Sequence, residues 1–122
     1  RGYPFLRDPQ FFDFIAVAAH RNPHVVNGRL DRRVEQETKA KIDLLFRTAI
    51  HMGKNSLVLS ALGCGAFGNP NVHIAALFKE AILKYNGYFE VIIMAVMDER
   101  QLPGGNFAVF HRELHNLTTR TY

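Results

Sequence analysis

The residues best suited to chemistry are three glycines within six positions, Gly63, Gly65 and Gly68, which follow an apolar run and precede Asn69-Pro70. Because glycine has no Cβ, such a loop can adopt positive φ angles, and its backbone N–H groups can converge on one ligand. Asn69 is a favourable N-cap and Pro70 a favourable first helical residue, so we expect the positive end of a helix to face the loop. This combination predicts a site for an anion, most plausibly a phosphate or pyrophosphate.

Other candidate groups carry weaker signals. Cys64 precedes a predicted helix, a setting that lowers a thiol pKa, but a nucleophile also needs a positioned base, so we expect a small side chain packed under the loop. Asp98 and Glu99 could protonate a leaving group, yet adjacent acids usually form a solvated loop face. His111 and His115 are four residues apart on a predicted helix, but the sequence offers no third metal ligand. We predict no catalytic residue, metal or cofactor in this chain.

The elements that position the glycine loop follow from two alternating patterns. Continuous apolar runs suit strands that are buried on both faces, as parallel strands are. Between these runs, apolar residues recur every three or four positions, as they do on one face of a helix. The predicted strands span residues 11–19, 56–62 and 89–97, and the predicted helices span residues 31–52, 70–85 and 106–117.

This strand–helix alternation predicts an α/β fold with right-handed crossovers and a parallel sheet covered by helices. In open sheets of this class, ligands bind beyond the carboxyl ends of the strands. We therefore expect loops 20–24, 63–69 and 98–106 to lie together on one rim.

Length and composition favour one ordinary globular domain of 122 residues, with 48% hydrophobic and 21% charged residues. The single cysteine favours a reducing compartment, and we predict a cytoplasmic location. The net charge is +4, but Lys and Arg alternate with acids, as in residues 31–35, so we do not expect a nucleic-acid surface.

No apolar run is long enough to span a bilayer, and we expect no membrane partner. The chain begins with Arg and has no signal peptide, so it is expected to be a piece of a longer or processed protein.

The three glycines satisfy G-x-G-x-x-G, the pattern of dinucleotide-binding loops, but the context argues against that class. Pro70 begins the helix after the last glycine, whereas the third glycine of the fingerprint packs inside the helix. The acidic residue expected about 20 positions further on is missing near Tyr88. A Gly-Lys-Ser/Thr sequence is also missing, so the loop is not a Walker loop.

The string LVLSALGCGAFGNP, residues 57–70, resembles the microbial-type poly(ADP-ribose) glycohydrolase branch of the macrodomain superfamily. Residues 4–8 (PFLRD) and 18–23 (AAHRNP) are similar to that family's segments around its middle strand. Gly105-Asn106-Phe107 and Phe110 match its closing helix. The resemblance covers nearly the whole chain and is far more specific than the glycine spacing alone.

The resemblance implies a three-layer α/β/α macrodomain with a mostly parallel sheet, of which residues 1–122 form the carboxyl-terminal part. It also implies an ADP-ribose ligand, whose diphosphate the amides of residues 63–68 would hold while Phe67 covers the adjoining ribose. Phe110 or Phe107 would stack on adenine near Asn106, and Asn22 would line the rim. The ligand-binding residues that it implies are Asn22, Gly63, Cys64, Gly65, Ala66, Phe67, Gly68, Asn69, Asn106, Phe107 and Phe110.

Two departures from the family pattern bear on function. Asn71 occupies the position where the family usually has a second proline. The family's glycine-rich first loop and Gln-Glu-Glu catalytic motif belong to an amino-terminal half that this sequence does not contain. We therefore expect a parent that hydrolyses ADP-ribose linkages on a polymer or a modified protein, and a chain that binds the ligand without cleaving it efficiently. The alternatives are a non-catalytic module for ADP-ribose or a related nucleotide, and a structural remnant without a ligand. An open sheet edge also predicts self-association.

Overall fold

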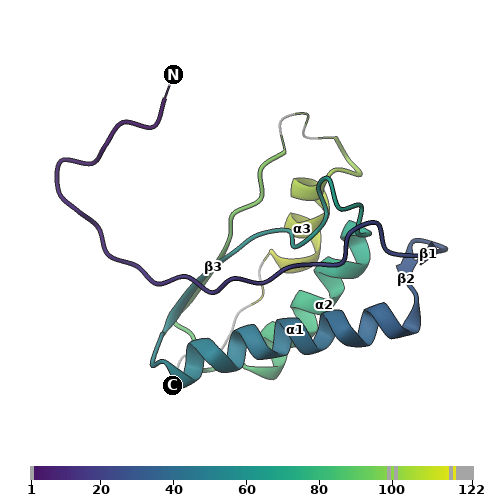
Figure 1. The fold of residues 1–122 in the computed structure, drawn as a ribbon, viewed down its shortest axis with the longest axis horizontal. Coiled ribbons are helices and arrows are strands. Elements are labelled where there is room, and N and C mark those ends of the chain that lie inside the picture. Colours follow the sequence, from purple (N-terminus) through teal and green to yellow (C-terminus); the bar gives the residue numbers. More distant parts are fainter. Residues whose placement is uncertain (1, 99, 101, 116, 118–122) are drawn as a thin grey trace.

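Figure 1 shows the fold in a computed structural model, which describes residues 2–98, 100, 102–115 and 117. Helices and strands alternate along most of the chain, after an amino-terminal segment that extends away from the helices. In chain order the elements are β1 (Val25–Val26), β2 (Arg29–Leu30), α1 (Arg32–His51), β3 (Ser56–Leu59), α2 (Asn71–Lys84), β4 (Val91–Met94) and α3 (Asn106–Leu114).

The ends of α1 follow from its capping residues. Asp31 is the N-cap, and its Oδ1 accepts a 3.0 Å hydrogen bond from the amide of Val34. Gly53 follows the last turn with a φ of 71°, the left-handed conformation that commonly ends a helix. The predicted helix over residues 31–52 is therefore confirmed, with Asp31 and Met52 as its cap residues.

The two longer strands form the centre of the fold. β3 and β4 pair in parallel, with Leu57 opposite Ile92 and Val58 opposite Ile93. Because side chains alternate between the two faces of a strand, Leu57 and Ile92 pack against the core while Val58 and Ile93 stay exposed. The predicted α/β class with a parallel sheet is confirmed.

The strand predicted over residues 11–19 is wrong. The structure gives these residues an irregular conformation, and the side chains of Phe11, Phe12 and Phe14 are 96%, 68% and 84% exposed. An apolar run of this kind forms a strand only where a neighbouring strand pairs with it and both of its faces are covered. Neither condition is met by the described residues beside β3.

A short antiparallel hairpin, β1–β2, was not predicted. Asn27 and Gly28 form its turn with φ angles of 51° and 74°, as expected for an Asn-Gly hairpin. Asn-Gly is a common turn sequence, but strands of two residues are too short to show an alternating pattern. The hairpin packs through Leu30, which is 4% exposed.

The hydrophobic core lies between the inner face of the sheet and the helices. α2 packs against both α1 and α3. Phe46 of α1 meets Phe89 edge to face at 5.7 Å between ring centroids, and Phe78 of α2 lies 6.3 Å from Phe110 of α3. The described residues thus cover one face of the sheet, as expected for a truncated three-layer fold. No helix in the described ranges is both long and apolar enough to cross a membrane.

Candidate functional site

The glycine loop, residues 63–69, is joined to the loop that precedes β1 by two hydrogen bonds. The amide of Asn22 donates to the carbonyl oxygen of Phe67 at 2.7 Å. The side-chain Nδ2 of Asn69 donates to the carbonyl oxygen of His20 at 2.8 Å. These bonds hold two segments that are more than forty residues apart in sequence at the carboxyl end of β3.

The loop that leads from β4 into α3 reaches the same place. Asn106 Nδ2 donates to the carbonyl oxygen of Cys64 at 3.2 Å. Asn71 Nδ2 lies 3.0 Å from both Asn106 Oδ1 and the carbonyl oxygen of Gly104. The predicted meeting of three loops on one rim is therefore confirmed.

The linking role of Asn71 was not predicted, because the sequence marks this residue only as a departure from the family pattern. Its position directly after Pro70, at the start of a helix that faces the rim, was the available signal. An amide side chain there can donate to a neighbouring loop, which a proline cannot do.

Each of the three loop positions is glycine for a different physical reason. Gly63 has a φ of 72°, and a Cβ there would clash with Ala19 and with the side chain of Asn69. Gly68 also has a φ of 72°, whereas Gly65 lies outside this positive-φ region. A Cβ on Gly65 would meet nothing within 4 Å. Folding thus explains Gly63 and Gly68, while the space over Gly65 is open to a ligand.

The same part of the loop presents free hydrogen-bond donors. The amides of Gly68 and Asn69 are used within the loop, by bonds of 3.0 and 2.9 Å to the carbonyl oxygens of Gly65 and Gly63. Across the part of the chain that the structure describes, the amides of Gly65, Ala66 and Phe67 have no hydrogen-bond partner. Consecutive free N–H groups of this kind can bind an anion.

The first turn of α2 adds to this positive potential, although its cap differs from the prediction. The helix begins at Asn71, with Pro70 as an N-cap that makes no side-chain hydrogen bond. Asn69 is not the cap, because its buried side chain donates to the carbonyl oxygens of His20 and Gly63 instead. The N-terminus of α2 therefore lacks a side-chain cap directly after the glycine loop, and it carries partial positive charge.

Cys64 has the structural role that we expected rather than the chemistry of a nucleophile. Its side chain packs against the hydrophobic core, and its Sγ lies 3.6 Å from the carbonyl oxygen of Leu62. Burial raises the pKa of the Cys64 thiol to about 12. At neutral pH the thiol is protonated and unreactive.

Asp98 is positioned against α3. Its Oδ2 accepts a 3.4 Å hydrogen bond from the amide of Phe107, and the same oxygen would clash with a Cβ on Gly105. The carboxylate therefore accepts from the first turn of α3, whose N-cap residue is Gly105. Glu99, the second acid of the pair, lies outside the described residues.

The aromatic residues of the predicted site divide into exposed and buried ones. Phe67 and Phe107 are 39% and 46% exposed, so both can contact a ligand. Phe110 is 2% exposed, and this excludes it from stacking on adenine. The helical spacing had left open which of Phe107 and Phe110 belongs to the core, and the core residue is Phe110.

His111 of α3 and His115, the residue that caps the carboxyl end of this helix, stack on each other. The rings of His111 and His115 lie 4.2 Å apart between centroids, and Phe107 stacks on His111 at 5.7 Å. Among the residues with a described placement, no group of three or more His, Cys, Asp or Glu side chains could hold a metal ion.

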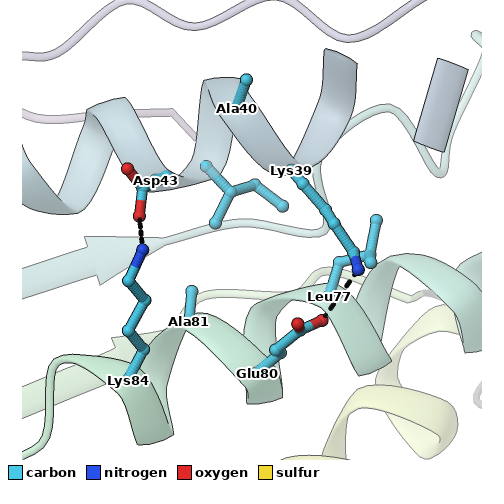
Figure 2. Close-up of a pocket in the computed structure, with 8 residues that line it drawn as sticks. Lys39, Ala40, Asp43, Leu77, Glu80, Ala81 and Lys84 are labelled. Atoms are coloured by element: carbon cyan, nitrogen blue, oxygen red, sulfur yellow. Dashed lines mark hydrogen bonds and ion pairs between the residues drawn. The ribbon is translucent and has the colours of Figure 1, made fainter. Parts of the chain in front are cut away.

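A separate groove of about 280 Å³ runs between α1 and α2 (Figure 2). Lys84 Nζ lies 2.7 Å from Asp43 Oδ1, and Lys39 Nζ lies 3.4 Å from Glu80 Oε2 across the groove. The hydrogen bond from Lys84, with a further one from Tyr85, lowers the pKa of Asp43. Because these four charges pair across the groove, it is a contact between packed helices, and the glycine loop remains the candidate site.

A scan against protein-family models finds no match for this chain, and a search of the curated proteins finds none. Among solved structures, the chain is similar to poly(ADP-ribose) glycohydrolase from Deinococcus radiodurans, crystallised in complex with ADP-ribose. The sequence identity is 30% and the TM-score 0.65, over 70% of this chain and 35% of that chain. The predicted resemblance is confirmed. The chain has the fold of part of this macrodomain enzyme, and it spans about a third of that enzyme's length.

Proposed function

We propose that this chain is the ADP-ribose-binding part of a poly(ADP-ribose) glycohydrolase-like hydrolase, with the glycine loop 63–69 holding the diphosphate. The observation that carries the proposal is the open space over Gly65 beside the free amides of Gly65, Ala66 and Phe67. Two phosphates need several converging donors and close approach to the backbone, and this loop offers both. The similar enzyme was crystallised with ADP-ribose, which supports the choice of this anion.

The exposed aromatic residues suit the rest of the ligand. Phe67 continues the glycine loop, so its ring would cover the ribose next to the diphosphate. Phe107 follows Asn106, whose side chain contacts the glycine loop, and its ring offers a flat face for adenine. The loop over residues 20–24, which contains Asn22, would line the rim of the ligand site.

We further propose that the chain binds this ligand without cleaving it efficiently. Cleavage of a glycosidic bond needs a carboxylic acid that can reach the leaving group. Asp98 instead caps α3, and Cys64 is a protonated core thiol. The catalytic acid would therefore come from the part of the enzyme fold that this chain does not span. An ADP-ribosylated protein would be the natural partner of the complete enzyme.

Titration calorimetry with ADP-ribose tests the binding site through Gly65. We expect Gly65→Glu to abolish binding, because the carboxylate would occupy the phosphate position and repel the anion. The folded chain should tolerate this substitution, since nothing lies within 4 Å of the new Cβ. Gln36→Glu on α1 adds the same charge at an exposed position outside the loop and should bind as the unchanged chain does.

Two further ligands test which parts of ADP-ribose the chain binds. ADP should retain most of the affinity, because it keeps the diphosphate and adenine, while adenosine should lose most of it. Equal binding heats for the unchanged chain and Gly65→Glu, or no binding heat from either, would contradict the proposed binding site. Hydrolysis of ADP-ribosylated protein by the 122-residue chain at the rate of a complete glycohydrolase would contradict the division between binding and cleavage.

A further inference from the structure

One amide side chain ties together three segments of the candidate site. Asn71 is the first residue of α2, and its Nδ2 lies 3.0 Å from both the carbonyl oxygen of Gly104 and Asn106 Oδ1. Asn106 in turn donates from its own Nδ2 to the carbonyl oxygen of Cys64 at 3.2 Å. We call these three hydrogen bonds the Asn71 network. They connect the start of α2, through the first residue of α3, to the glycine loop.

The directions of the three bonds agree with one another. An amide side chain has an NH2 group with two donors and an oxygen that only accepts. The NH2 group of Asn71 faces two acceptors, so it can satisfy both of them. If the Asn106 amide were turned over, its NH2 group would face that of Asn71, and its oxygen would face the carbonyl oxygen of Cys64. The donor on Asn71 thus fixes the direction in which the Asn106 amide points.

The last bond of the network sets the direction of a donor in the proposed ligand site. The carbonyl group of Cys64 and the N–H group of Gly65 belong to one peptide unit, which is planar and trans. In such a unit the two groups point in opposite directions. Because Asn106 holds the carbonyl oxygen of Cys64, the Gly65 N–H group is turned away from Asn106. Among the described residues this N–H group has no hydrogen-bond partner.

The next peptide unit of the loop offers an internal comparison. Its carbonyl oxygen, that of Gly65, accepts a 3.0 Å bond from the amide of Gly68, while its N–H group, that of Ala66, is another proposed donor to the diphosphate. A hydrogen bond to the carbonyl oxygen polarises a peptide unit and strengthens its N–H group as a donor. The loop itself supplies this bond for Ala66. For Gly65 the bond comes from Asn106 of α3, which is oriented by Asn71.

We propose that Asn71 is a positioning residue for anion binding. It orients the Asn106 amide, which holds the carbonyl group of Cys64 and so aims the Gly65 N–H group at a phosphate. The inference rests on the proposed function, because it assigns this N–H group to the diphosphate. It adds that the affinity for the diphosphate depends on the start of α2 and on the loop that precedes α3.

Asn71→Pro removes the donor with little disturbance to the helix. Proline is favoured at the first helical position, where the backbone N–H group has no partner within the helix. The preceding Pro70 has a ψ of 116°, an extended conformation that suits a following proline. Asn71→Ala removes the same donor but keeps the backbone N–H group, so the two variants should behave alike. Val72→Ala, which shortens an apolar side chain that is 49% exposed, serves as the control.

The Asn71 network can be measured without a ligand. In proton–nitrogen correlation spectra of the unliganded chain, both Asn71 variants should shift the Gly65 amide resonance more than the Ala66 resonance. The Ala66 unit should keep its resonance because the amide of Gly68 holds it. Val72→Ala should leave both resonances in place. Circular dichroism confirms that each variant keeps its helices.

Titration calorimetry with pyrophosphate and with ADP-ribose measures the effect on binding. Loss of one hydrogen bond to a charged group corresponds to about a tenfold loss of affinity, which we expect for both ligands in both Asn71 variants. Val72→Ala should bind as the unchanged chain does. In an Asn106→Ala background, Asn71→Ala should cause no further loss, because Asn71 acts through Asn106.

Three results would overturn the positioning role and leave the proposed function intact. They are an unshifted Gly65 resonance in the folded Asn71 variants, an affinity equal to that of the unchanged chain, and a further loss of affinity in the Asn106→Ala background. Failure of the unchanged chain to bind either ligand would instead contradict the proposed function, and the positioning role with it.

Discussion

The amide of Asn22 donates a 2.7 Å hydrogen bond to the carbonyl oxygen of Phe67, across 45 residues of sequence. Asn22 makes this bond with a φ of 48°, a left-handed conformation that few residues other than glycine and asparagine adopt readily. The backbone of one loop thus holds the carbonyl group beside an aromatic residue of the candidate site. The position of Phe67 depends on the conformation of Asn22.

Replacing Asn22 by Val tests this dependence. A β-branched residue in the left-handed region costs about 1–2 kcal/mol, so Asn22→Val should lower the free energy of unfolding by that amount. It should also weaken ADP-ribose binding, while Asn22→Gly should keep the fold. Asn27→Val, at a φ of 51° in the β1–β2 turn, provides a matched control that costs stability without affecting affinity. Urea unfolding and calorimetry measure both effects, and equal affinity losses at the two positions would contradict the link to Phe67.

The sequence predicts the helices of this fold well and one of its strands badly. Asp31 and Gly53 mark the ends of α1 through local hydrogen bonds and backbone angles, which do not depend on distant parts of the chain. The apolar run over residues 11–19 depends on a partner strand and on a cover for its second face. No local pattern reports whether these are present.

In the candidate site too, some features could be predicted from the sequence and others could not. Strand–helix alternation predicts that the three loops meet, because parallel strands place their carboxyl ends on one edge. It does not predict the choice that Asn69 makes between capping α2 and bridging to His20, since both use the same side chain. Nor could helical spacing decide between Phe107 and Phe110, which lie on neighbouring parts of α3.

The protonated state of Cys64 predicts its reactivity. Because burial raises the thiol pKa to about 12, iodoacetamide should not alkylate the folded chain at neutral pH. The chain unfolded in urea should react at the rate of a free cysteine, which shows that the reagent is active. Mass spectrometry measures the modified fraction. Rapid alkylation of the native chain would mean that the thiol is accessible and ionised, as a nucleophile would be.

His73 predicts a pH dependence of stability. The ring is 2% exposed, and its Nδ1 accepts a 3.0 Å hydrogen bond from the amide of Leu30. Arg29 Nη2 lies 3.1 Å from Nε2, Glu35 Oε1 lies 3.4 Å from the same nitrogen, and these two groups are 3.6 Å apart. Burial above all, together with Arg29 and the more distant Lys39, lowers the pKa of His73 against the opposing effect of Glu35.

Because the unfolded chain binds this proton more readily than the folded chain, the stabilisation is complete above the ordinary pKa of 6.5 and is lost as the pH falls below it. His73→Asn keeps an acceptor for the amide of Leu30 but cannot titrate. The free energy of unfolding should therefore fall more steeply below pH 6.5 in the unchanged chain than in His73→Asn. Urea titrations over this range measure the two slopes, and parallel curves would show that His73 does not contribute.

Phe107 and Phe110 predict opposite effects of the same substitution. Phe107 is 46% exposed, so Phe107→Ala should leave the free energy of unfolding nearly unchanged. Stacking of a base on an aromatic ring contributes about 1–3 kcal/mol, and ADP-ribose binding should weaken accordingly. Phe110→Ala should instead destabilise the fold by about 3–5 kcal/mol, because it leaves a cavity beside Phe78. Calorimetry with ADP-ribose and urea unfolding separate the two roles. Full affinity in a folded Phe107→Ala variant would mean that adenine does not stack on this ring.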